Sequence, residues 1–111
     1  MSCQNLNWSG NIKYLASNAD KVPESGGLYK VLRNDGVDGK LTRLYVGKAA
    51  NLRNQFNFHL SDNEENECIR ENVRNKECYF QYALQAGEDN RHAAENHLLE
   101  TGKYECNTQG Q

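Results

Sequence analysis

The sequence predicts an α+β domain in which a small three-stranded antiparallel sheet is flanked by helices in the order β-β-α-α-β-α. Two observations support this fold class. Three segments, residues 27–33, 42–47 and 78–84, are rich in aromatic and branched residues and are bounded by glycines or turn formers. The remaining long segments carry apolar residues at spacings of three and four, which is typical of amphipathic helices. With 111 residues in total, one domain is expected.

Residues 1–24 are polar and form an N-terminal lead-in, with a short helix predicted around residues 11–16. Pro23 ends any helix before the glycine pair at positions 26 and 27, so the domain is predicted to span residues 25–111. Residues 27–33 then form a strand, and residues 42–47 form its partner. The segment between them, residues 34–39, is Asn-Asp-Gly-Val-Asp-Gly, which favours a hairpin turn.

The helices follow from apolar spacing. Residues 50–60 place Leu52, Phe56 and either His59 or Leu60 on one face, and residues 64–75 carry a thinner apolar stripe. The alternating, aromatic-rich residues 78–84 predict the third strand. A last helix is predicted from residue 88 or 89 to residue 101, with Gly102 placed to end it.

Several classes of protein are disfavoured by composition. No apolar run is long enough to cross a membrane, and the first residues lack the pattern of a signal peptide, so a cytoplasmic protein is expected. The four cysteines show no C-x-x-C spacing, which argues against a zinc ribbon or a disulfide framework. Reduced, partly buried thiols are therefore predicted.

Charge is unevenly distributed along a chain whose net charge is −2. Residues 30–53 carry six cations against two aspartates, and residues 62–71 carry five acids against one arginine. The basic run coincides with the predicted hairpin, which favours a surface that faces phosphate. The acidic run is interpreted as a solvated helix face.

Two tyrosines on the predicted hairpin each stand beside a glycine, in Gly27-Leu28-Tyr29 and in Tyr45-Val46-Gly47. The second is followed by Lys48, Asn51 and Leu52, and His59 comes 14 positions after Tyr45. Near the end of the chain, Glu95 precedes Leu98-Leu99 and is followed by Asn107. This order of motifs, over roughly residues 23–107, resembles the GIY-YIG nuclease superfamily.

The resemblance implies a metal-dependent endonuclease that hydrolyses the phosphodiester bonds of double-stranded DNA. It implies that Tyr29 is the candidate base and that Tyr45 and His59 orient water or the scissile phosphate. We expect the two phenol hydroxyls to face one concave, partly basic surface, and Gln55 and His59 to lie on the helix face toward them. A phenol with a pKa of about 10 needs a neighbouring cation or a proton-sharing base to act near neutral pH, and Lys48 is the candidate cation. Glu95 is the expected ligand of one Mg²⁺ or Mn²⁺ ion.

Three positions complete the expected site. Lys48, Arg53 and Asn107 are candidate contacts to nucleic acid. Gln55 occupies the catalytic position where the family has an arginine, ten residues after Tyr45. An amide lacks the permanent charge and forked donors of a guanidinium. Arg53 is two residues away, about 200° around the helix, and so cannot replace it.

Three interpretations remain open at the level of sequence. The chain is a nuclease, natural or inactivated through Gln55. Alternatively it is a catalytically degenerate module of the same fold that binds DNA or protein. A third interpretation is an interaction protein that meets a basic partner through acidic residues 62–71. Metal-dependent cleavage separates the first from the others, and salt-sensitive DNA binding without cleavage separates the second from the third.

Overall fold

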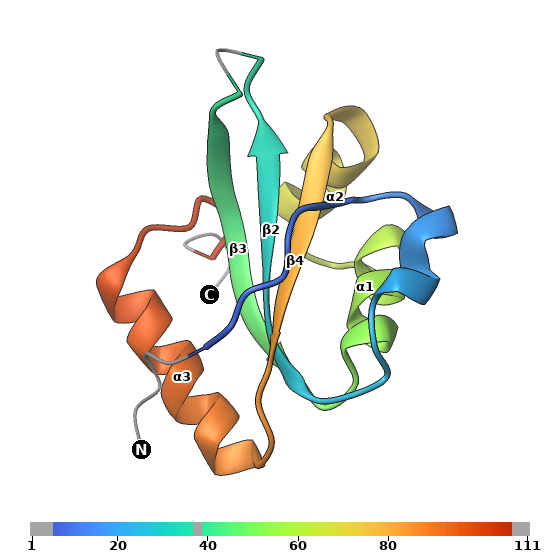
Figure 1. Cartoon of the computed structure of the whole chain (residues 1–111). Helices are drawn as coiled ribbons and strands as arrows, with labels where there is room; N and C mark the ends of the chain where they lie inside the picture. The colour runs from blue at the N-terminus through green and yellow to red at the C-terminus, as the bar shows by residue number, and fades with distance from the viewer. Residues whose placement is uncertain (1–5, 37–38, 108–111) are drawn as a thin grey trace.

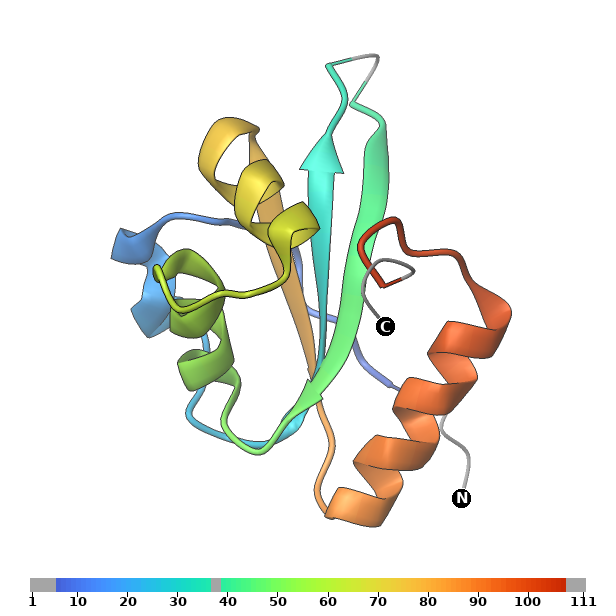
Figure 2. The same cartoon turned by 180° about the vertical axis from the view of Figure 1, so that it is seen from behind.

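The computed structural model describes residues 6–36 and 39–107. Within them an antiparallel sheet has the strand order β1-β4-β2-β3. Helices α1 and α2 lie together on one side of the sheet, and α3 packs along β3 on the other side of the molecule (Figures 1 and 2). The elements in chain order are β1 (Ile12–Lys13), the 3₁₀ helix η2 (Ala16–Lys21), β2 (Gly27–Asn34), β3 (Leu41–Ala49), α1 (Leu52–Leu60), α2 (Glu67–Asn75), β4 (Cys78–Leu84) and α3 (Glu88–Thr101).

The α+β class is confirmed, together with the three predicted strands and the three long helices. The prediction of a three-stranded sheet is wrong, because Ile12 and Lys13 pair with Phe80 and Tyr79 of β4 as a fourth strand. The helix predicted around residues 11–16 is also wrong, since the helical turns there begin only at Ala16. A two-residue strand is too short to show alternation in sequence, and its partner lies far along the chain.

Two asparagines set the starts of the helices on the first side of the sheet. The side chain of Asn51 accepts a hydrogen bond from the Asn54 backbone N–H, so α1 begins at Leu52. Asn66 does the same for the Ile69 N–H, so α2 begins at Glu67, three residues later than predicted. Asparagine is favoured at this position because its oxygen satisfies an N–H that the helix leaves unpaired. In the hairpin turn, residues 37 and 38 lie outside the described residues.

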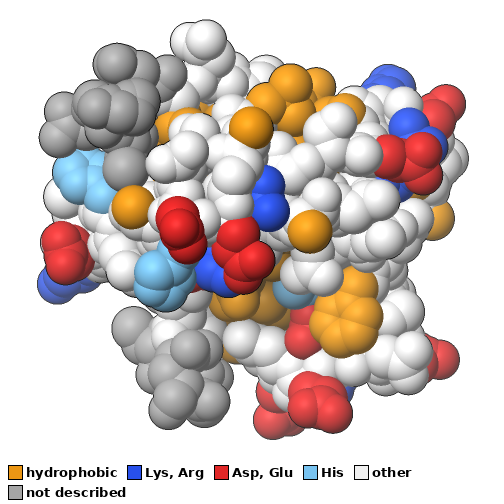
Figure 3. Space-filling model, turned by 90° about the horizontal axis from the view of Figure 1, so that it is seen from below, with side chains coloured by type: hydrophobic (Ala, Val, Ile, Leu, Met, Phe, Trp, Pro, Cys, Tyr) orange, Lys and Arg blue, Asp and Glu red, His pale blue; other side chains and the backbone are white. Residues whose placement is uncertain are grey.

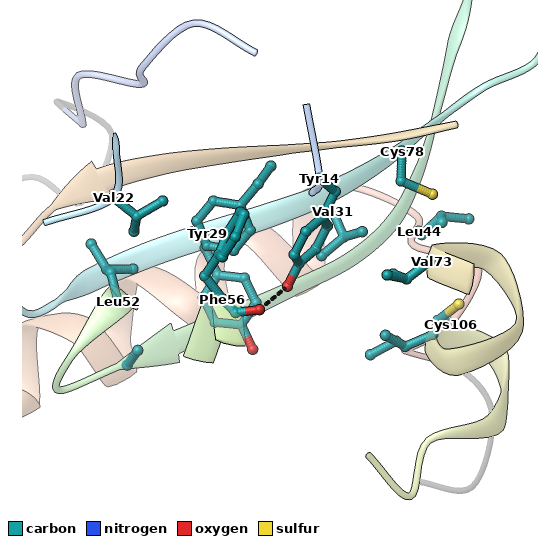
Figure 4. Close-up of a cluster of buried hydrophobic side chains, with 13 residues drawn as sticks. Tyr14, Val22, Tyr29, Val31, Leu44, Leu52, Phe56, Val73, Cys78 and Cys106 are labelled. Atoms are coloured by element: carbon teal, nitrogen blue, oxygen red, sulfur yellow. Dashed lines mark hydrogen bonds between the residues drawn. The ribbon is translucent and has the colours of Figure 1, made fainter. Parts of the chain in front are cut away.

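The core lies between the sheet and the pair α1 and α2, and aromatic rings occupy its centre (Figure 4). Tyr14 stacks on Phe56 at 4.4 Å between centroids and donates its hydroxyl hydrogen to the Phe56 carbonyl at 2.9 Å. Tyr29 stacks on Phe80 of the neighbouring strand at 5.4 Å. The ring of Tyr29 is therefore a core element as well as a candidate site residue.

The chain after α3 closes much of the β3 edge. The backbone N–H groups of Glu105 and Cys106 donate to the carbonyls of Arg43 and Leu44 at 3.1 and 2.6 Å. Cys106 also forms a disulfide with Cys68 of α2, which ties this segment across the sheet edge. No helix in the described ranges is long and apolar enough to cross a membrane.

The disulfide overturns the prediction that these cysteines are reduced thiols. Cys68 and Cys106 are 38 positions apart, and only the fold brings their Cα atoms to 5.3 Å. That separation carries no pattern that a sequence could reveal. Cys78 is a buried free thiol, as predicted, and Cys3 lies outside the described residues.

Candidate active site

Tyr29 and Tyr45 share one face of the sheet. In the antiparallel register of β2 and β3, Tyr29 is opposite Gly47 and Tyr45 is opposite Val31. Since side chains alternate between the two faces of a strand, both phenols point toward α1 and α2. Their ring centroids are 5.9 Å apart. This confirms the predicted pair on adjacent antiparallel strands.

Gly47 has a steric role beneath the first tyrosine. A Cβ atom at this position would lie 2.7 Å from the Tyr29 hydroxyl oxygen and 2.8 Å from the ring carbon that bears it. The phenol therefore passes directly over the backbone of β3, a position that any larger residue would block. The glycine that follows Tyr45-Val46 thus fixes where the Tyr29 hydroxyl lies.

Helix α1 brings two polar side chains to that hydroxyl. His59 Nε2 is 2.8 Å from the Tyr29 oxygen. The Gln55 side-chain amide donates to the same oxygen at 3.2 Å. The two residues are one helical turn apart, so the prediction that both face the tyrosines is confirmed.

Glu64 completes a chain of hydrogen bonds behind His59. Its Oε1 contacts His59 Nδ1, and its Oε2 accepts from the Asn66 backbone N–H at 2.8 Å. His59 and Glu64 are each 5% exposed. In the tautomer that carries the proton on Nδ1, His59 donates to the carboxylate, and Nε2 is left as an acceptor for the Tyr29 hydroxyl. The order of the chain is Glu64, His59, Tyr29.

Glu64 was missed in the sequence, where it stands in an acidic run between two helices. The run was interpreted as a solvated helix face, and that interpretation is wrong for Glu64, which is buried in the loop that connects α1 to α2. Asp62 of the same run is exposed and pairs with Arg74 at 2.5 Å. Only the five-residue separation from His59 offered a local signal, and it is too common to identify a pair.

Burial distinguishes the two tyrosines. Tyr29 is 1% exposed, so the expectation that its hydroxyl faces a concave, partly basic surface is wrong. Desolvation raises its pKa well above 10, the charge of an ionised Tyr45 would raise it further, and the hydrogen bond from Gln55 lowers it. Tyr45 is half-buried. Its pKa is raised by burial and then by Glu95 and Glu64, while hydrogen bonding with Tyr29 opposes the rise. Tyr45 is therefore the phenol that solvent can reach.

Glu95 reaches this site from α3. It is half-buried, and its negative charge raises the pKa of both Tyr45 and Tyr29. Because β3 is the edge strand, α3 packs beside the strand that carries Tyr45, and no other strand lies between them. A carboxylate is the kind of hard oxygen donor that Mg²⁺ accepts with water and substrate oxygens. Among the described residues, no group of three or more His, Cys, Asp or Glu side chains could hold an ion without such help.

Three predicted residues lie away from the phenols. Lys48 is opposite Leu28 in the register and so projects from the other face of the sheet. Arg53 donates through Nε to the Val22 carbonyl at 2.8 Å. Asn107 accepts from the Val46 N–H at 2.9 Å and donates to the Val46 carbonyl at 3.2 Å. Lys48 is thus not placed to lower the pKa of Tyr29, and the Asn107 amide is engaged in closing the β3 edge.

Cations of the basic run, residues 30–53, make contacts away from the phenols. Lys30 lies 4.3 Å from the Trp8 ring centroid, and Arg33 pairs with Asp35 at 2.9 Å. Seen from below, the molecule has a hollow in which hydrophobic, histidine and acidic side chains are visible (Figure 3). Glu64 and Glu95, which raise the pKa of both phenols, are carboxylates. The site therefore combines phenols, an imidazole, an amide and two acids.

Comparison with known proteins adds no relative to this description. No protein-family model matches the chain, and no curated protein matches its sequence.

Proposed function

We propose that this chain is a metal-dependent DNA endonuclease of the GIY-YIG type, in which Gln55 replaces the usual arginine. The observation that carries the proposal is the convergence of Tyr29, Tyr45, Gln55 and His59, with Glu95 close enough for its charge to raise the pKa of Tyr45. They come from β2, β3, α1 and α3. Residues spread through most of the sequence, each at a position that the family motif predicts for the site, meet around one pair of phenols.

The hydrogen-bond chain supplies a route for one proton. A water at the accessible side of Tyr45 transfers a proton to the Tyr45 oxygen. The hydroxyl proton of Tyr45 moves to the Tyr29 oxygen at the same time, and the hydroxyl proton of Tyr29 moves to His59 Nε2. The oxygen of the water attacks phosphorus while the bond from phosphorus to the leaving oxygen breaks, and that oxygen takes a proton from solvent. Glu64 stabilises the imidazolium that forms. The buried Tyr29 need never be a free phenolate.

This assignment changes the roles expected from the motif. Tyr45 meets water because it is half-buried, whereas Tyr29 acts behind it. Glu95 would hold one Mg²⁺ or Mn²⁺ ion, which when bound polarises the phosphate oxygen. Its single carboxylate fits Mg²⁺, which commonly keeps several waters and takes the rest of its ligands from the substrate. Double-stranded DNA is the proposed substrate.

A degenerate binding module is the second candidate, and the Gln55 hydrogen bond favours it. The amide donates to Tyr29 at 3.2 Å, so the position is occupied by a neutral group that is already paired. Without a cation there, developing charge on the phosphate lacks one stabilising contact. Such a loss commonly costs a factor of about 10² to 10³ in rate.

Nicking of supercoiled plasmid in Mg²⁺ or Mn²⁺ tests the two candidates. Gln55→Arg should raise cleavage by about 10² or more, since it adds a guanidinium where the amide now meets Tyr29. Gln55→Met is the matched control, because it has a similar length without charge or hydrogen bonds. Glu95→Gln in the Gln55→Arg background should abolish the metal-dependent cleavage.

The result that would overturn the proposal is an uncut plasmid with Gln55→Arg when folding and DNA binding are intact. The module would then be the better description. Full-speed cleavage by the unmodified chain would instead assign the cationic role to another residue.

A further inference from the structure

A groove of about 870 Å³ lies between the start of β3 and the chain that follows α3. It is separate from the phenols, although both adjoin β3. The residues that line it are Lys40, Leu41, Thr42, Arg43, Leu99, Gly102, Lys103, Tyr104, Glu105 and Asn107.

The lining is cationic in an acidic chain. Lys40, Arg43 and Lys103 are all exposed and stand against one acid, Glu105. That acid is already paired with Arg33, at 3.4 Å. Because the whole chain carries a net charge of −2, three cations around one hollow depart from the average surface. The charge of the groove matches an anion.

The arginine of the groove is held in place while its charge stays accessible. Its guanidinium lies 5.3 Å from the centroid of the Tyr104 ring, and Tyr104 is 3% exposed and therefore fixed. A Cβ at Gly102 would come within 3.0 Å of Arg43 Nη1, so the glycine leaves room for this position. An arginine supported on an aromatic ring presents its forked donors in a set direction, which suits the oxygens of phosphate.

Apolar surface continues the groove beside the cations. Leu99 is 40% exposed and Leu41 is half-buried. Free phosphate would leave this surface uncovered, whereas the sugars of a nucleic acid strand would cover it. The groove also adjoins the proposed active site, because Asn107 lines it and binds the backbone of Val46, the neighbour of Tyr45. Arg43 and Tyr45 are two residues apart on β3, about 7 Å at roughly 3.3 Å per residue. The register shift between them pairs Tyr45 with Val31 and Arg43 with Leu32, so Arg43 leaves the opposite face of the sheet and the groove meets the tyrosine side around the β3 edge.

We propose that this groove binds the phosphodiester backbone of the DNA strand that leads into the tyrosine site. The inference rests on the proposed function for the direction of the strand, but binding can be measured without hydrolysis. Lys40, Arg43 and Lys103 contact successive phosphates, and Leu41 and Leu99 pack against sugars. Asn107 would lie next to the DNA because it lines the groove, while its side-chain amide remains hydrogen-bonded to the backbone of Val46.

The test is fluorescence anisotropy of labelled duplex DNA with the full chain, in EDTA so that no metal-dependent cleavage occurs. Salt is varied from about 50 to 200 mM. The double variant Lys40→Glu/Lys103→Glu is compared with Lys21→Glu/Lys76→Glu, which makes the same charge change at exposed positions outside the groove lining. Thermal unfolding verifies that both are folded.

The groove variant should bind at least about tenfold more weakly, and its plot of log affinity against log salt should be shallower by about 2, or 0.9 per lost phosphate contact. The control should change much less. In an ¹⁵N spectrum, DNA should shift the amides of Thr42 and Gly102.

Equal weakening in both double variants would overturn the proposal, because it would show bulk electrostatics alone. Failure of the unmodified chain to bind DNA would also overturn the proposal. It would likewise be overturned if the groove bound ATP while the affinity for DNA did not depend on Lys40 and Lys103. If Gln55→Arg does not cut but the groove dependence holds, hydrolysis fails as a function and the groove stands. If it cuts and the groove variants behave like the control, only the groove assignment fails.

Discussion

Replacing Glu64 by glutamine tests the buried hydrogen-bond chain directly. The carboxylate accepts from His59 and from the Asn66 N–H with separate oxygens. Glutamine keeps one acceptor oxygen and turns the other into a donor, so one of the two N–H groups loses its partner. An unsatisfied buried donor costs about 1 to 3 kcal/mol. Glu64 is only 5% exposed, so water cannot readily replace the lost bond. For a domain of this size, the midpoint of thermal unfolding should fall by about 4 to 12 °C.

The pH dependence gives a second signature of the same group. Burial raises the pKa of Glu64, but hydrogen bonds from His59 and from backbone N–H groups outweigh it, so the folded pKa lies below 4.5. A depressed carboxyl pKa contributes stability that is complete above the unfolded value and is lost as pH falls through the folded value. The unmodified protein should therefore lose this contribution below about pH 4.5, whereas Glu64→Gln should not. The difference in stability between the two should shrink in acid.

Urea unfolding near pH 7 and near pH 4 measures this difference, and ¹⁵N spectra of the imidazole report its tautomer. Glu65→Gln is the matched control, because it changes the adjacent, exposed glutamate. The unmodified protein should show His59 protonated on Nδ1, and Glu64→Gln should populate the other tautomer as well. Equal stability of the two variants at neutral pH, with an unchanged tautomer, would refute the chain of hydrogen bonds.

Three further outcomes are expected. Gly47→Ala should displace the Tyr29 hydroxyl, since its Cβ would lie 2.7 Å away, and ¹⁵N spectra should show that the His59 ring has lost its partner. Reducing the Cys68–Cys106 bond, which closes 38 positions, should lower the free energy of unfolding by about 4 kcal/mol in the chain-entropy description, measured by urea unfolding with and without dithiothreitol. Burial raises the pKa of Cys78 to about 11, so its thiol should resist iodoacetamide in the folded protein near pH 8 and react once urea unfolds it.

Most of the fold could be predicted because local sequence patterns indicate its main strands and helices. The third predicted strand, residues 78–84, coincides with β4, where alternation and aromatic content agree. The two helix starts were placed early, at residues 50 and 64, because the sequence analysis did not recognise Asn51 and Asn66 as the residues that cap these helices. β1 has two residues and no pattern of its own, and its existence depends on β4.

The candidate site likewise contains residues that local sequence patterns predicted and residues that they did not. Tyr29, Tyr45, Gln55 and His59 were found from motif and helical spacing, and they meet. Lys48 was expected beside the phenols, although it is three residues from Tyr45, and an odd step along a strand reverses the face. Glu64 was missed because a loop carries no period.

In the proposed mechanism, burial is the reason why the two phenols exchange the roles that the motif suggests. β2 is an inner strand between β4 and β3, so Tyr29 is enclosed by Phe80 and by α1, whereas Tyr45 lies on the edge strand near α3. A group that meets substrate must be on the accessible side, and a group that stores a proton is better held inside. Glu64 and Glu95 both oppose ionisation of the phenols. In the proposed mechanism, a cation at position 55 would offset both carboxylates and stabilise the charge that develops on the phosphate. The amide of Gln55 does neither, and for this reason we expect the Gln55→Arg assay to distinguish a nuclease from a binding module.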